Sequence, residues 1–146
     1  MNVSKSLLIV AKRLNQLGIP WRLFASGALM VWGVEINPKD LDIFVSAKDV
    51  VSLEKIFKEY VVNPLHTFKE KDKEYLEFQM QIDGVEIEIC ELEDLGKIEF
   101  VDYGGEKIPV APLQEIRDEY RANSPFQDCL PLIQKRIDEL KQRKLI

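Results

Sequence analysis

The segments L-F-A-S-G-A-L (residues 23–29) and D-L-D-I-F-V (residues 40–45) decide the fold of this 146-residue chain. The first predicts a strand over residues 21–25 that turns at Ser26-Gly27 into a short helix over residues 28–32. The second predicts a strand whose apolar residues face the core. Because alternate residues of a strand share a face, Asp40 and Asp42 stand side by side on the opposite face. Carboxylates this close repel each other, and a divalent cation is the usual compensation.

Hydrophobic periodicity predicts the other elements. Strands are predicted at residues 76–82 and 85–89, joined by the strong hairpin signal Asp83-Gly84. A short strand is predicted at Val61-Val62, and one or two more within residues 98–110. Ser46 is a predicted N-cap. Helices are predicted over residues 4–17, from 47 to about 60, from about 112 to before Pro125, and from about 128 to 144.

This order of elements favours an α/β (α+β) fold with one mixed sheet. Helices pack on one face of the predicted sheet, and the other face is open and carries carboxylates. We expect residues 1–146 to form a single domain, with C-terminal helices from about residue 112.

The composition argues against some partners and compartments. Twenty basic and 25 acidic residues give a net charge of −5, so a nucleic-acid partner is not favoured. The apolar stretches are too short for a membrane span or a secretory signal, which predicts a cytoplasmic protein. We expect Cys90 and Cys129 to be free buried thiols. His66, the one histidine of the sequence, is predicted to lie in a loop or at a sheet edge.

A third acidic position follows the hairpin signal. Glu86 and Glu88 alternate with apolar residues and therefore share one face of their strand. If this strand neighbours residues 40–45, all four carboxylates project from the same open face. Three of them would form an oxygen cage for one or two Mg²⁺ ions. The alternative is that these acids are only the solvated face of a strand.

The strand-to-helix junction at Ser26-Gly27 is a candidate phosphate site. Small residues let backbone N–H groups approach a phosphate, and a helix N-terminus favours negative charge. The Ser26 hydroxyl could add a hydrogen bond. Lys39, beside Asp40, is a second candidate for phosphate binding.

Residues 23–33 and 38–45 together resemble the signature of the DNA polymerase β-type nucleotidyltransferase superfamily. Its small bacterial and archaeal members, including aminoglycoside and lincosamide nucleotidyltransferases, are the most similar in pattern. The resemblance implies a nucleotidyltransferase-like fold, in which Ser26 and Gly27 hold the triphosphate and Asp40 and Asp42 bind metal. Glu88 would be the third ligand or the base. The chain departs from the pattern at its turn, which is Ala-Ser-Gly rather than Gly-Gly or Gly-Ser.

The resulting functional hypothesis is a nucleotidyltransferase that depends on Mg²⁺ or Mn²⁺. It would move a nucleoside monophosphate from an NTP to a hydroxyl of an unidentified small-molecule or protein acceptor. A second hypothesis is a non-catalytic protein of the same fold, which binds nucleotide or acts as a toxin–antitoxin partner, as a homodimer or with a second protein. A third is a small α/β interaction domain, in which Asp40 and Asp42 only end a solvated strand.

Overall fold

The computed structural model describes residues 2–123 and 127–146. Its helices are α1 (Val3–Leu17), α2 (Ala25–Val31), α3 (Ala47–Ile56), α4 (Leu113–Asn123) and α5 (Leu130–Gln142), with 3₁₀ turns η1 (Lys58–Tyr60) and η2 (Gln127–Cys129). Its strands are β1 (Arg22–Phe24), β2 (Asp40–Val45), β3 (Val61–Glu70), β4 (Lys73–Ile82), β5 (Val85–Glu91), β6 (Glu99–Tyr103) and β7 (Glu106–Val110).

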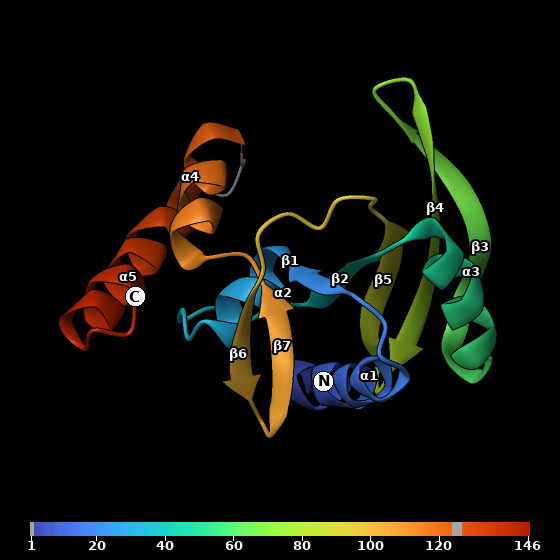
Figure 1. The fold of residues 1–146 in the computed structure, drawn as a ribbon, viewed down its shortest axis with the longest axis horizontal. Coiled ribbons are helices and arrows are strands. Elements are labelled where there is room, and N and C mark those ends of the chain that lie inside the picture. Colours follow the sequence, from blue (N-terminus) through green and yellow to red (C-terminus); the bar gives the residue numbers. More distant parts are fainter. Residues whose placement is uncertain (1, 124–126) are drawn as a thin grey trace.

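Five strands form a mixed sheet in the order β1-β2-β5-β4-β3. Strands β2 and β5 are parallel, and every other pair in this sheet is antiparallel. The predicted mixed sheet is therefore confirmed. Figure 1 shows the β3–β4 hairpin extending past the sheet, with α4 and α5 on the other side of the molecule.

Strands β6 and β7 form a separate two-stranded sheet instead of joining the single predicted one. The buried Ile108 and Val110 explain the difference. They turn β7 toward the main core, where this strand contacts α1 and β1. The short alternation within residues 98–110 predicts strands, but it does not say with which sheet they pair.

The core lies on one face of the five-stranded sheet. Alternate residues of β2 and β5, such as Leu41 and Ile87, are fully buried there. Helix α1 covers this face with a stripe that was predicted from its periodicity; the stripe consists of Leu7, Val10, Ala11 and Leu14. Packing the core on one face leaves the other face of the sheet open.

Several local predictions are confirmed. The helix predicted over residues 4–17 ends at Gly18, which is in the left-handed region at φ +68°, and the Ser46 side chain accepts a hydrogen bond from the Asp49 N–H at the start of α3. Asp83 and Gly84 have φ values of +51° and +80° in the β4–β5 turn. Two positive values are what a type I′ hairpin turn requires.

Strand β3 is much longer than the predicted Val61-Val62, and α3 ends at Ile56 rather than near Tyr60. The pairing of β3 with β4 shifts register between Val61 and Asn63 and again between Asn63 and His66. These shifts break the apolar–polar alternation by which a strand is recognised. Among the helices of the described residues, none is both long enough and apolar enough to cross a bilayer.

Candidate active site

The parallel pairing of β2 and β5 brings the predicted carboxylates together. In this register Asp40 lies opposite Glu86, and Asp42 lies opposite Glu88. The intervening Leu41 is fully buried on the other face. The two strands are therefore neighbours, which is the condition that the sequence analysis set, and all four carboxylates line the open face.

The pKa of Asp42 is strongly raised. Burial raises its pKa from the usual 3.8 to about 6, and the nearby charges of Asp40, Glu88 and Glu86 add to the effect. The charges that shift this pKa are all negative. A divalent cation would supply the missing charge.

Glu88 is better placed than Glu86 to be the third carboxylate. It lies directly opposite Asp42 in the register and is partly buried, whereas Glu86 is exposed. Burial raises the pKa of Glu88; the Cys90 thiol, 3.1 Å from its Oε1, lowers that pKa in part, and nearby Glu77 raises it further. The geometry therefore favours Glu88, as the resemblance implied.

Ser26 and Gly27 lie in the first turn of α2 and not in a turn before it, because this helix begins at Ala25 rather than at the predicted residue 28. Gly27 is buried, and a Cβ there would lie 3.0 Å from Leu41 Cδ2 and 3.1 Å from Leu23 Cδ1. A side chain at this position would have to push these two leucines aside, so glycine lets α2 pack closely on β1 and β2. Lys39 is exposed and directly precedes β2.

The chain reverses at Ala25, the residue before this pair. Ala25 has φ +54°, in the left-handed region that favours glycine. The family that the sequence resembles has glycine in this turn. Alanine at position 25 therefore places local strain beside the candidate phosphate site.

We expect Ala25→Gly to stabilise the protein. The substitution relieves a left-handed alanine, which outweighs the extra chain entropy of glycine in the unfolded state, for a net gain of about 0.5–1 kcal/mol. Urea unfolding measures the change. Ala28→Gly, a buried position within the same helix, is the matched control and should lose about 1 kcal/mol or more. Destabilisation by both substitutions would contradict the assigned strain.

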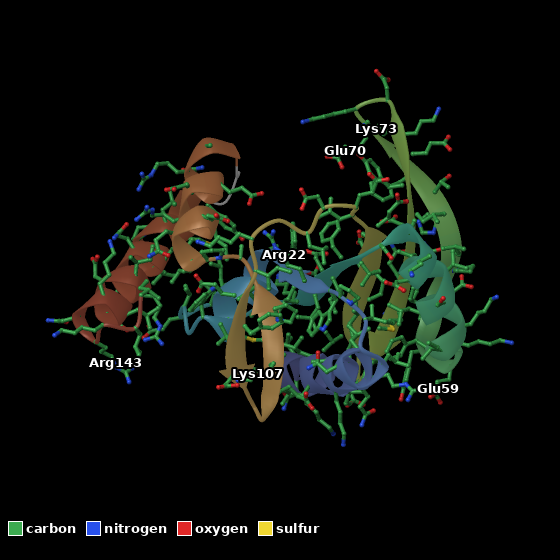
Figure 2. The ribbon with its side chains drawn as sticks, viewed as in Figure 1. Arg22, Glu59, Glu70, Lys73, Lys107 and Arg143 are labelled. Atoms are coloured by element: carbon green, nitrogen blue, oxygen red, sulfur yellow. The ribbon has the colours of Figure 1, made fainter. Side chains whose placement is uncertain are left out.

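Aromatic residues that the sequence did not single out border the start of α2. The rings of Phe24 and Phe44 lie 4.3 Å apart between centroids, and the Arg22 guanidinium lies 3.9 Å from the Phe24 ring centroid. A small cavity of about 100 Å³ separates Phe24 from Tyr120 of α4. Figure 2 shows Arg22 near the middle of the molecule, far from Glu70 and Lys73 at the tip of the β3–β4 hairpin.

Solved structures of similar shape decide the fold. A protein of Thermotoga maritima assigned as a nucleotidyltransferase superposes with a TM-score of 0.67 at 23% identity, covering 95% of this chain and 96% of that one. The chain has the nucleotidyltransferase fold. This agrees with the expectation from residues 23–33 and 38–45.

Two further solved structures share this nucleotidyltransferase fold. The lincosamide adenylyltransferase LnuA, with lincomycin bound, has a TM-score of 0.60 at 10% identity and covers 89% of this chain and 95% of its own. ANT(2″)-Ia, in complex with adenylyl-2″-tobramycin, has a TM-score of 0.59 at 12% identity, covering 97% and 93%. Neither a family model nor a curated protein matches the sequence significantly.

The nucleotidyltransferase sheet also brings together a group that the sequence did not reveal. His66 of β3 lies opposite Glu77 of β4, which lies opposite Cys90 of β5. His66 is therefore on an edge strand, as predicted, but its imidazole points to a neighbour: Nε2 lies 2.7 Å from Glu77 Oε1. Cys90 and Cys129 are both free, as predicted; Cys90 is buried and Cys129 is only partly so. His66, Glu77 and Cys90 lie on three different strands, so no local sequence motif predicts that they meet.

Proposed function

We propose that this chain is a metal-dependent nucleotidyltransferase that moves a nucleoside monophosphate from an NTP to a hydroxyl group. The observation that carries the proposal is the register of β2 and β5, which sets Asp40 and Asp42 beside Glu86 and Glu88. The fold alone would not suffice, because one fold serves many functions.

The residues of the site fit a hard divalent cation. Their donors are carboxylate oxygens, which Mg²⁺ and Mn²⁺ prefer, and the raised pKa of Asp42 marks negative charge without a partner. Asp40, Asp42 and Glu88 would hold the ion or ions. A bound Mg²⁺ supplies neutralisation of phosphate charge and lowers the pKa of a coordinated hydroxyl.

The protein's own contribution is positioning. The first N–H groups of α2 have no intrahelical acceptor, and among the described residues no side chain caps them. The N–H groups at Ser26 and Gly27, with the Ser26 hydroxyl, would orient the triphosphate, and Lys39 would contact it from the start of β2. Holding the donor in line with the acceptor hydroxyl supplies much of the catalysis in such a reaction.

Small-molecule hydroxyls are the acceptors that we propose first. The solved structures with this fold include one with lincomycin and one with an adenylylated tobramycin. Incubation with each NTP, labelled at the α-phosphate, and a panel of hydroxyl-bearing antibiotics, sugars and proteins would identify a labelled product. Release of pyrophosphate in step with that product is expected.

Thermal unfolding with Mg²⁺ and each of the four NTPs tests donor binding directly. Ligand at a hundredfold excess over its dissociation constant adds about 2.7 kcal/mol to the free energy of unfolding. We expect a Mg²⁺-dependent rise in the wild type and none in the Asp40→Asn/Asp42→Asn double variant. Asp102→Asn, at an exposed position of β6, is the control that keeps the rise. The absence of a rise with any NTP would sink the proposal and favour an interaction domain.

A further inference from the structure

A thiol lies between two carboxylates on the open face of the sheet, next to the proposed nucleotide site. Cys90 Sγ is 3.1 Å from Glu88 Oε1 and 3.4 Å from Glu77 Oε2. One ligand atom from each of these three residues lies within 4.8 Å of the others. With Zn–S near 2.3 Å and Zn–O near 2.1 Å, neighbouring ligand atoms in a tetrahedral site lie roughly 3.3–3.7 Å apart. The two distances from Cys90 Sγ are close to this spacing.

The surroundings of this group call for positive charge. Cys90 is 3% exposed, and its Sγ lies within hydrogen-bonding distance of both carboxylates. Glu77 and Glu88 each place one carboxylate oxygen within 4.8 Å of the other. Like charges at this distance need a shared proton or a cation between them.

His66 holds one of the carboxylates from outside the group. Its Nε2 is 2.7 Å from Glu77 Oε1, and its Nδ1 is 2.8 Å from the carbonyl oxygen of Pro64. Each ring nitrogen of His66 therefore has an acceptor. The hydrogen bond to Pro64 and the contact with Glu77 raise the pKa of the imidazole. Burial raises the pKa of Glu77, but its hydrogen bonds, that of His66 first, outweigh this and lower it. The other oxygen, Oε2, remains turned toward Cys90. Ligating carboxylates are commonly oriented by such an outer partner.

We propose that Glu77, Glu88 and Cys90 form a binding site for a divalent transition-metal ion, with Zn²⁺ as its natural occupant and His66 orienting Glu77. This site shares Glu88 with the proposed Mg²⁺ site, but its sulfur ligand distinguishes it, because thiolate selects zinc-like ions whereas Mg²⁺ prefers oxygen alone. On binding, the thiol loses its proton to solvent and Sγ bonds the ion. The inference requires neither nucleotide binding nor transfer.

Titration of the full chain with Co²⁺ tests the site, since a cobalt–thiolate bond gives a charge-transfer band in the near ultraviolet. We expect this band in the wild type and its loss when Zn²⁺ displaces Co²⁺. Cys90→Ser should abolish it. Cys129→Ser, which removes the other free thiol, is the matched control and should keep the band.

Two further variants distinguish the loss of a metal ligand from misfolding. Glu77→Gln keeps the thiol and the side-chain shape, and should weaken Co²⁺ binding by more than tenfold while circular dichroism stays unchanged. Asp40→Asn should keep the band, whatever becomes of Mg²⁺ or nucleotide binding. A wild type without the band, a band that survives in Cys90→Ser, or a band lost in Cys129→Ser would each overturn the proposal.

Discussion

Asp42→Asn is expected to abolish nucleotide transfer while leaving a folded and more stable protein. Asp42 lies between Asp40 on its own strand and Glu88 on the next, so the variant loses the central ligand of the proposed cation site. Loss of an outer partner of a metal ligand commonly costs 10–100-fold in affinity or activity, and loss of a ligand itself should cost more than about 100-fold. Steady-state transfer of a labelled nucleoside monophosphate measures this.

The gain in stability has a definite pH dependence. The pKa of Asp42 in the folded protein is about 6, which is above its usual value. Protonated Asp42 therefore stabilises the folded state below pH 4, and this stabilisation is lost as the pH rises through 6. Without divalent cations, Asp42→Asn should therefore exceed the wild type by about 1–2 kcal/mol at pH 7.5, allowing for solvent screening. The difference should shrink toward zero near pH 4.

Urea unfolding at both pH values measures the difference. The control is Asp102→Asn, which changes an exposed carboxylate beside Lys107. It should stay within about 0.5 kcal/mol of the wild type at either pH. A stability gain of Asp42→Asn that does not depend on pH would argue against the cost of ionising this buried carboxyl beside its acidic neighbours as the cause.

Gly27→Val is expected to lower the free energy of unfolding by about 2–3 kcal/mol. Its side chain would enter the space where a Cβ is already 3.0 Å from Leu41 Cδ2 and 3.1 Å from Leu23 Cδ1. Helix α2 must then move away from β1 and β2. Because Leu41 stands between Asp40 and Asp42, we expect transfer activity to fall as well. Chemical denaturation gives the loss of stability.

A double-mutant cycle isolates the contact. Leu41→Ala removes the δ-methyl carbon that the new side chain would strike, at its own cost of about 2–5 kcal/mol. In that background Gly27→Val should cost at least about 1 kcal/mol less than in the wild type. Additive losses would mean that the close contact with Leu41 is not what requires glycine at this position.

The parts of the site that depend on local pattern could be predicted from the sequence. The period of two in residues 40–45 and 85–89 assigns each side chain to a face, and the Asp83-Gly84 turn fixes the β4–β5 register. The sequence left open whether residues 40–45 and 85–89 are neighbours. With that condition met, the pattern predicts the carboxylate cluster.

The remaining parts depend on contacts that no local pattern encodes. The register shifts in β3 break its apolar–polar alternation. The sequence therefore does not predict the full strand or the pairing of His66 with Glu77. Gly27 suggested a turn because glycine is a poor helix former. Its place inside α2 follows from the packing of Leu23 and Leu41, which the sequence does not show.

The strand order also has a consequence for how the molecule acquires its site. Strands β3, β4 and β5 follow one another as an antiparallel meander and can form through short loops. The parallel pairing of β2 with β5 instead closes a long loop that contains α3 and two strands. We therefore expect Asp42 and Glu88 to meet when β2 docks against a meander that is already formed. We expect their mutual repulsion to act late in folding, on a chain that has gained enough hydrophobic contact to withstand it.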